Sequence, residues 1–354
     1  MEHNLNKKQA IQGTSSDALM QKLFAISKGY YQDIYQHKLA GTNISDQKFL
    51  PIMNRGTWSR VKAIRSQIEF IIEQNLKNSN KTQIINLGCG MDSLFFYLKN
   101  KYVNYNNNNN NNESSELKNI CVLELDYSEI TKQKIKNINY SKDLKKMLLN
   151  SNDDNNNKGS ISSDNKKITF SKEYNLINCD LNNSKELVDI INYTLDNGFF
   201  SSNNLTIIVA ECLLCYLNKE EALNMIKNIS NKIDNCVIIY YDVINPNDEF
   251  GKVMINNLKQ FRNITLPGYT TYPDEISHEN RMKECGFTYN NKCIDMLKYF
   301  NNYIPENEKN LINHLELLDE LEEWNLLQQH YCIGFGIKIS NEDNYEFLKC
   351  FNLV

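Results

Sequence analysis

The sequence predicts an α/β protein whose central, mainly parallel sheet is covered by helices on both faces. Between residues 83 and 242, short runs of β-branched and other apolar residues alternate with stretches of helical spacing. The runs are continuously apolar, which is typical of strands that are buried on both faces of a parallel sheet. Ligands of such sheets bind at the carboxyl ends of the strands, so a site is expected there.

The predicted elements follow one another in a regular order. Residues 14–78 predict helices, the first opening with Ser15 and Asp17, two residue types that cap helix N-termini. Strands are predicted over residues 82–88, 119–126, 174–181, 204–217 (with the exit of the strand) and 235–244. The helices between them are predicted over residues 93–100, 128–138, 184–195 and 218–233.

The region after residue 244 is less regular. A helix is predicted over residues 249–261, then an irregular stretch, then a second helix over 311–329. Residues 330–340 alternate apolar and other residues, which predicts a strand that pairs at a sheet edge.

Two polar tracts, near residues 103–116 and 150–167, are rich in Asn, Ser and Asp. They are too poor in apolar residues to offset the entropy of ordering, so we expect disordered surface insertions. Added loop length has a small thermodynamic cost, so these tracts mark loops of the fold and not domain borders.

Composition excludes several classes of function. The net charge of −4 disfavours a nucleic-acid or anionic-membrane partner. No secretory or transit signal is visible, and no apolar run reaches the roughly 20 residues of a spanning helix. The ten cysteines lie mostly in apolar runs, as expected of reduced, buried thiols. Cys212 and Cys215 form a C-x-x-C pair, but no second ligand pair accompanies them, which disfavours a zinc or redox site. The five histidines show no metal spacing. We expect a cytoplasmic protein, with a nuclear location also open.

A glycine turn and three acids follow the predicted strands. Gly88-Cys89-Gly90 comes after the first strand, where bare backbone lets a ligand approach. Asp126 ends the second strand and suits ribose hydroxyls, Asp180 ends the third and suits an adenine amino group, and Glu211 ends the fourth. Each acid taken singly could instead cap a helix or face solvent. A glycine turn that binds no ligand would have the same sequence pattern.

The spacing distinguishes between nucleotide cofactors. NAD-binding turns carry G-x-G-x-x-G, whereas here Ser93 stands at the third glycine position. No G-x-x-x-x-G-K-[ST] phosphate-binding loop occurs. The shorter G-x-G with acids after the next three strands fits S-adenosylmethionine (SAM) best.

At these residues the chain resembles a known family. The blocks "NRGTWSRV", "QIINLGCGMDSLFFYL", "VLELD" and "IIVAECLLCYL", with others from residue 14 to residue 338, resemble leucine carboxyl methyltransferases. The resemblance implies a Rossmann-like class I SAM-dependent methyltransferase fold. It also implies methylation of the C-terminal leucine carboxylate of the protein phosphatase 2A catalytic subunit, with S-adenosylhomocysteine as the second product.

The resemblance also implies a set of site residues. Lys22 and Arg60 would hold the carboxylate at the methionyl end of the cofactor, with Arg60 also near the substrate carboxylate. Tyr216 would form a wall of the substrate pocket. The other implied cofactor contacts are Gly88 through its backbone, Asp126 at the ribose, Asp180 and Leu181 at the adenine, and Glu211 at the amino or sulfonium end. Departures such as Cys89 and Cys179 leave this chemistry intact.

The resemblance further suggests a domain plan. Residues 1–80 would form a helical extension that contributes to the site, and residues 81–354 the methyltransferase core, with a lid near 245–310. We expect a monomer. Two alternatives stay open: a carboxyl methylase of a modified tRNA base, and a cofactor-binding protein that docks on the phosphatase without catalysis. The tRNA methylases carry a long repeat region, whereas this chain stops at Val354.

Overall fold

The structure is a computed structural model of the 354-residue chain. It describes residues 2–41, 48–107, 117, 119–148, 160–161, 167–169, 171–340 and 342–354. The prediction of disorder in the two polar tracts falls for the most part on residues outside these ranges. Within the described part, the first tract is entered by the helix that ends at Asn107, and the second holds a short strand, Ser160–Ile161.

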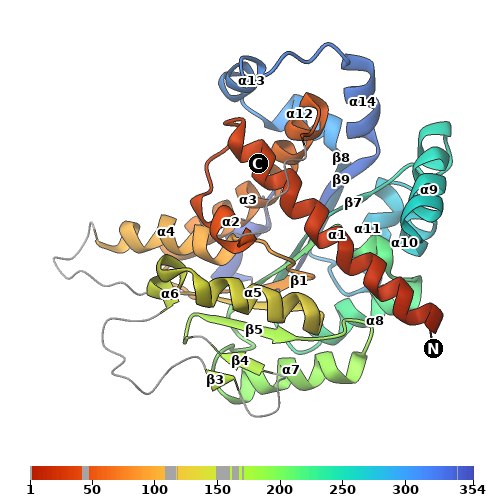
Figure 1. The fold of residues 1–354 in the computed structure, drawn as a ribbon. Helices are drawn as coiled ribbons and strands as arrows, with labels where there is room; N and C mark the ends of the chain where they lie inside the picture. The colour runs from red at the N-terminus through yellow and green to blue at the C-terminus, as the bar shows by residue number, and fades with distance from the viewer. Residues whose placement is uncertain are drawn as a thin grey trace.

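A nine-stranded sheet in the order β3-β4-β5-β2-β1-β6-β7-β9-β8 forms the centre of the molecule (Figure 1). Five neighbouring strands are parallel, as predicted, and the pairs β3-β4, β4-β5, β7-β9 and β8-β9 are antiparallel. The parallel strands are β1 (Thr82–Leu87), β2 (Ile120–Asp126), β5 (Tyr174–Asn178), β6 (Leu205–Glu211) and β7 (Cys236–Val243). The others are β3 (Ser160–Ile161), β4 (Lys167–Thr169), β8 (Asn290–Asp295) and β9 (Tyr331–Lys338).

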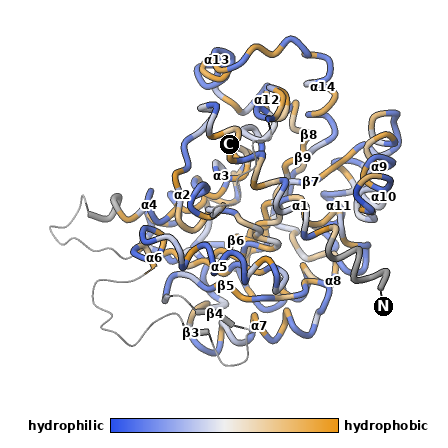
Figure 2. Tube along the Cα trace, in the orientation of Figure 1, coloured by the Kyte–Doolittle hydropathy of each residue, from blue (hydrophilic) through white to orange (hydrophobic). Residues whose placement is uncertain are grey.

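Each parallel strand contributes to both faces of the sheet. Every residue of β1 is buried, and successive residues alternate between two core clusters: Ile84 packs with α3 (Pro51–Lys77) and α4 (Leu94–Asn107). Ile85 packs with α7 (Ser184–Asp196) and α8 (Lys219–Ser230). Apolar segments accordingly gather around the sheet (Figure 2). The continuous apolar runs of the sequence thus correctly predict a sheet that is covered on both sides.

Three helices precede the sheet: α1 (Glu2–Ser27), α2 (Ile34–Ala40) and α3. The predicted start of the first helix at Ser15 and Asp17 is wrong, because both lie inside α1. The residues before them include Glu, Lys, Gln, Ala and Leu, which favour a helix and contain no proline that would end it. α3 begins with Pro51 at its first position, where a missing N–H costs nothing.

The short crossover helices are α5 (Ser128–Tyr140) and α6 (Lys142–Leu148), and beyond β7 the chain forms α9 (Glu249–Arg262), α10 (Pro267–Thr271) and α11 (Glu275–Glu284). The last helices are α12 (Met296–Tyr303), α13 (Glu306–Asn313) and α14 (Leu321–Gln329). The helix predicted over 311–329 is therefore interrupted, with residues 314–320 outside helices.

The strand β8 is missing from the sequence prediction, and this also misplaces β9. β8 reads "NNKCID", so it has no apolar alternation that would reveal it. Because β8 occupies the edge, β9 lies between β7 and β8 and not at the edge as predicted. Gly334 of β9 allows close packing there, since a Cβ would lie 2.3 Å from the Tyr240 ring.

Among the helices that the described residues form, none has the length and apolar character needed to cross a bilayer.

Candidate active site

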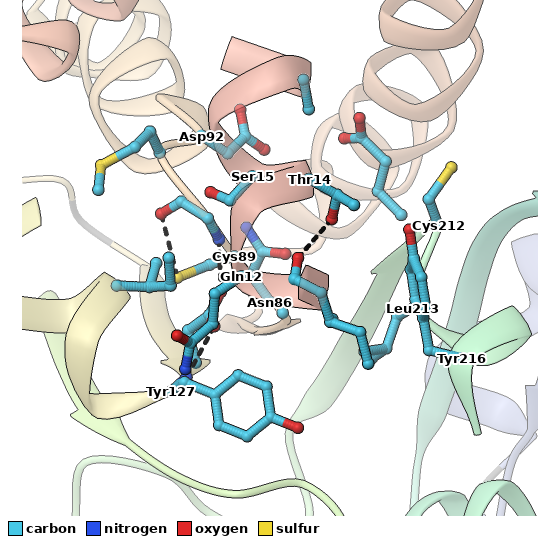
Figure 3. Close-up of a pocket in the computed structure, with 18 of the residues that line it drawn as sticks. Gln12, Thr14, Ser15, Asn86, Cys89, Asp92, Tyr127, Cys212, Leu213 and Tyr216 are labelled. Carbon is cyan, nitrogen blue, oxygen red and sulfur yellow. Dashed lines mark hydrogen bonds between the residues drawn. The ribbon is translucent and has the colours of Figure 1, made fainter. Parts of the chain in front are cut away.

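A cavity of about 530 Å³ lies at the carboxyl ends of β1, β2, β5 and β6. Its volume is within the range of small-molecule sites. The strand order reverses between β1 and β6, the point where open α/β sheets bind ligands. The facing wall comes from α1, where residues from Ile11 to Lys22 line the cavity. Figure 3 shows Thr14 and Ser15 of this helix above the cavity, with Tyr127 and Tyr216 on its walls.

The structure brings every residue of the predicted site to this one cavity. The residues that line it include Lys22, Arg60, Gly88, Asp126, Asp180, Leu181, Glu211 and Tyr216. Their convergence follows from the parallel register, in which Leu87 pairs with Leu125 on one side and Ala210 on the other. The individual roles of these residues stay predictions.

The glycine turn after β1 is shaped by the backbone and by α1. Gly88 and Gly90 have φ values of 63° and 50°, which L side chains rarely adopt. A Cβ on Gly90 would lie 2.9 Å from Ser15 Oγ, and one on Gly88 would lie 3.2 Å from a Leu213 methyl group. The glycines therefore permit both the dihedral angles and the close approach of α1.

Replacing Gly90 with alanine is expected to weaken SAM binding by about tenfold or more, because strain of ~1–2 kcal/mol is added beside a steric conflict with α1. Isothermal titration calorimetry measures this. Gly198→Ala is the matched control, since Gly198 has a φ of 68° but nothing within 4 Å of a new Cβ. Equal loss of cofactor binding in the two variants would contradict the role of the turn.

Asp126 holds the glycine turn and faces the cavity. Its Oδ2 accepts from Gly90 N–H at 2.7 Å, and its Oδ1 accepts from Tyr127 N–H at 2.7 Å. Burial raises the pKa of Asp126, although these two hydrogen bonds favour the ionised form. Each carboxylate oxygen keeps one lone pair that can accept a further hydrogen bond. Ribose hydroxyls are donors of the kind that would fit.

The end of β5 supplies a more open part of the cavity wall. Asp180 Oδ1 accepts from Asn182 N–H at 3.2 Å, which fixes the turn after the strand. The neighbouring Leu181 side chain is buried against the cavity. This pairing of an acid with an apolar surface suits a purine ring, which needs both an acceptor for its amino group and an apolar contact.

A buried cluster of charges lies at the other end of the cavity. Glu211 is held between two cations: Lys22 Nζ lies 3.1 Å from its Oε2, and Arg60 Nε lies 3.1 Å from its Oε1. Lys22 Nζ also lies 3.5 Å from Asp92 Oδ1. Burial alone would raise the pKa of Asp92, but Lys22 and other neighbouring cations keep it below its ordinary value. The cluster therefore alternates positive and negative groups, as a zwitterionic ligand requires.

Arg60 combines burial with an unused donor. Its guanidinium lies 5.9 Å from the centre of the Tyr241 ring. Its Nη2 is buried and has no hydrogen-bond partner within the described residues. Burial would lower the pKa of Arg60, but the Glu211 carboxylate raises it above its ordinary value. A permanently charged, partly unpaired guanidinium at a cavity wall is suited to bind a carboxylate.

The chain leaves β6 through a strained residue. Cys212 has a φ of 49°, an uncommon value for a residue with a side chain, and its N–H donates to Tyr241 O at 2.8 Å. The turn leads into the short 3-10 helix η1 (Leu214–Tyr216), which places Tyr216 on the cavity wall. Burial raises the pKa of Cys212 to about 12 and that of Cys215 well above its ordinary value, so neither thiol is suited to redox chemistry.

Several residues that line the cavity are not among the predicted site residues. They are Thr14 and Ser15 of α1, Asn86 of β1, Asp92 and Tyr127. Asp92 and Tyr127 were detectable, because Asp92 lies just beyond the glycine motif and Tyr127 directly follows Asp126. The α1 residues carried no signal, since only the packing of α1 over the sheet edge brings them to the site.

A second cluster of ligand-type residues lies outside the cavity. Side-chain atoms of His278, Cys293 and Cys332 come within 4.8 Å of one another. Both His278 nitrogens are already engaged, with Tyr272 O at 3.1 Å and Arg281 Nη2 at 2.9 Å. Burial and the adjacent Arg281 lower the pKa of His278. The buried cation disfavours a metal ion at this position.

Unpaired polar atoms on the cavity wall are a separate observation that supports SAM as the ligand. Four polar atoms of its lining residues, Ser15 Oγ, Arg60 Nε and Nη2, and Asn86 Nδ2, are buried without a hydrogen-bond partner in the described part of the chain. Buried polar groups are normally satisfied, so these atoms indicate a polar ligand. A nucleoside beside Asp126 and Leu181 and a charged amino-acid end beside Lys22 and Glu211 would match the wall.

Comparisons with known proteins agree with this geometry. Residues 4–230 match the family model described as leucine carboxyl methyltransferase. A leucine carboxyl methyltransferase 1 homologue of Arabidopsis thaliana is 30% identical over 338 residues, covering 95% of this chain and 92% of that protein. Leucine carboxyl methyltransferase 1 of Bos taurus is 29% identical over 334 residues, covering 94% and 91%.

A more distant relative and two solved structures complete the comparison. The tRNA wybutosine-synthesizing protein 4 of Rattus norvegicus is 24% identical, and the match covers 91% of this chain but 43% of that protein. A candidate methyltransferase of Thermobifida fusca YX has the same fold, with a TM-score of 0.50, 11% identity and coverage of 91% and 94%. A duf574 family protein of Streptomyces avermitilis also has a TM-score of 0.50, with 7% identity and coverage of 86% and 95%.

The predicted fold, cofactor and enzyme class are thereby confirmed. The chain belongs to the leucine carboxyl methyltransferase family and is a SAM-dependent carboxyl methyltransferase.

Proposed function

We propose that the chain methylates the C-terminal leucine carboxylate of the protein phosphatase 2A catalytic subunit. The observation that carries the proposal is the buried Arg60 guanidinium, whose Nη2 has no partner among the described residues and which lines the cavity beside Glu211. A guanidinium binds a carboxylate through two parallel hydrogen bonds. The relatives named leucine carboxyl methyltransferase 1 support a leucine carboxylate as the acceptor.

The chemistry requires placement more than proton transfer. A C-terminal carboxyl group has an ordinary pKa of about 3.3–3.7, so at neutral pH it is already a nucleophile and needs no general base. SAM supplies an electrophilic methyl group when bound. The protein's task is to align the two, which can remove up to about 7–11 kcal/mol of barrier. In this chain Arg60 would orient the acceptor and Tyr216 would bound its path.

The remaining residues of the cavity would hold the cofactor. Lys22, with Arg60, would bind its carboxylate and Glu211 its amino or sulfonium end, since these charges alternate in the cluster. The other proposed contacts are Gly88 through its backbone, Asp126 with the ribose hydroxyls, and Asp180 with Leu181 at the adenine. Because Lys22 lies on α1 and Arg60 on α3, the N-terminal extension (residues 1–80) would complete the site.

A lid over the substrate, predicted near residues 245–310, could involve only part of that segment. β8 and α11 pack within and against the sheet, since α11 contacts both β8 and β9. α9 and α10 are better placed, because Met254, Ile255 and Leu266 pack against the same buried cluster as Tyr216 of the cavity wall. We therefore propose that α9 and α10 form the lid.

We further propose that the protein is a monomer in a reducing compartment such as the cytoplasm. Such a compartment suits its ten free cysteines.

The experiment is mass spectrometry of phosphatase C-terminal tails after incubation with the enzyme and SAM. A gain of one methyl group on the terminal leucine is expected, and a phosphatase that lacks this leucine should stay unmodified. A parallel reaction with tRNA tests the substrate suggested by the similarity to the wybutosine-synthesizing protein. Methylated tRNA with an unmodified phosphatase would overturn the proposed substrate, and SAM binding without any methylation would leave only the docking alternative.

The maximal rate should be level from about pH 7 to 9. Burial raises the pKa values of Tyr216 and Tyr241, and Glu211 keeps that of Arg60 high, so these groups hold their protons throughout. Toward acid, Asp126 should take up a proton at a higher pH than an exposed aspartate, ordinarily near 3.9, because burial raises its pKa. Cofactor binding should therefore weaken first. A clear rise of kcat with pH near neutrality would instead indicate a general base and contradict this prediction.

A further inference from the structure

A fully buried lysine lies directly beneath the glycine turn. The Lys134 side chain, on α5, has no exposed surface, and it does not belong to the residues that line the cavity. Its Nζ lies 2.6 Å from Glu124 Oε2 and donates to the backbone O of Asp92 at 2.7 Å. Glu124, on β2, also accepts from the Tyr174 hydroxyl at 2.6 Å. The motifs of the sequence did not reveal either charged residue.

Through this contact Lys134 reaches the charges of the site. Asp92 follows Met91 just beyond the glycine turn, and its carboxylate lies 3.5 Å from Lys22 Nζ. Lys22 in turn pairs with Glu211. The position of the Asp92 backbone therefore sets where one end of the Asp92-Lys22-Glu211 chain of charges lies.

Three side chains from outside this segment bind the backbone of residues 88–92. Asp126 binds Gly90 N–H, Gln36 Nε2 donates to Met91 O at 2.6 Å, and Lys134 binds Asp92 O. Lys134 thus completes a row of contacts to consecutive peptide groups. It is the one anchor whose own position depends on a buried ion pair with a second charged residue, Glu124.

A buried ion pair is weak evidence for stability, since the loss of hydration offsets most of the attraction. An apolar pair would fill the same volume, but it would leave the carbonyl of Asp92 without this donor. We propose that Lys134 is a positioning residue for methyl transfer: Glu124 fixes its ammonium group, which holds the Asp92 carbonyl and so keeps the glycine turn in the shape that receives SAM. The proposal rests on the proposed function only for the use of SAM.

The test compares two double variants that each remove a buried ion pair without leaving an unpaired charge. Lys134→Met with Glu124→Gln removes the anchor and keeps an acceptor for Tyr174. Lys99→Met with Glu173→Gln is the matched control, because Lys99 Nζ lies 2.6 Å from Glu173 Oε2, both side chains are buried, and neither is among the residues that line the cavity. Thermal unfolding reports the stability of both proteins, and calorimetry reports SAM binding.

We expect the first variant to bind SAM at least about tenfold more weakly, and the control to stay within about twofold of the parent protein. In assays, the KM for SAM should rise while kcat at saturating SAM stays within about threefold. Equal SAM affinity in the two variants would overturn the proposal, as would a loss that follows stability alone. Should the first variant not fold, Glu124→Gln alone decides. This variant removes the carboxylate that fixes the Lys134 ammonium group, so its SAM affinity should fall, and an unchanged affinity in the folded variant would overturn the proposal.

These results are independent of the phosphatase. SAM binding by the parent protein needs no methyl acceptor. If the phosphatase were not methylated, the proposed substrate would be contradicted, but the SAM affinities of the two double variants would still test the role of Lys134.

Discussion

Arg60→Ala is expected to abolish detectable methylation, with a fall in kcat/KM on the order of 10³-fold. The physical reason is the loss of a guanidinium that lines the cavity beside Glu211 and whose buried Nη2 has no hydrogen-bond partner among the described residues. The substitution should not unfold the protein, because Glu211 keeps its ion pair with Lys22. Steady-state methylation of a phosphatase tail, together with thermal unfolding, measures both effects.

Two controls identify the cause. Arg60→Lys keeps the charge but not the two-pronged geometry, so an intermediate activity is expected. Arg55 lies on the same helix and is buried, with its guanidinium carbon 5.7 Å from the centre of the Trp324 ring, but it does not belong to the cavity wall. Arg55→Ala should lower stability and retain kcat. Full activity in folded Arg60→Ala would show that the acceptor is held elsewhere.

Asp126→Ala is expected to weaken SAM binding by about 10²-fold, since hydrogen bonds to a charged acceptor contribute about 1.5–3 kcal/mol each. The variant loses the proposed ribose acceptor and also leaves Gly90 N–H and Tyr127 N–H without their partner. Calorimetry with SAM or S-adenosylhomocysteine gives the loss directly.

Asp126→Asn separates the two effects, because the amide oxygen can still accept from Gly90 while the charge is lost. We expect an affinity between those of the parent protein and Asp126→Ala. If Asp126→Asn binds as weakly as Asp126→Ala, the charge is what matters; if neither variant loses affinity, the cofactor does not contact this carboxylate.

Local patterns determined much of the fold and of the strand-end residues. The apolar runs predicted all five parallel strands, and residues at the carboxyl ends of four of them, Gly88, Asp126, Asp180 and Glu211, line one cavity. These predictions succeed because the apolar residues of a strand indicate that it is buried. The carboxyl ends of neighbouring parallel strands lie at the same edge of the sheet. Lys22 and Arg60 came from the resemblance to the family, since a lysine or arginine on a helix has no local sign of its role.

Elements with weak local signals were misplaced for the converse reason. β8 contains few apolar residues and is held as a strand by its pairing with β9. Without it, the sequence put β9 at the sheet edge. The start of α1 was also misjudged, because residues before Ser15 favour a helix and include no proline, so α1 begins at Glu2.

By itself, then, the sequence determined the class of fold, the cofactor and the edge of the sheet at which the cofactor binds. Tertiary structure alone decided that α1 covers the cavity, that Lys22 and Arg60 enclose Glu211, and that Lys134 reaches the Asp92 carbonyl. The first set depends on hydrophobic patterns and backbone dihedral angles within a few residues. The second depends on contacts between side chains far apart in the chain, which exist only once the helices have packed on the sheet.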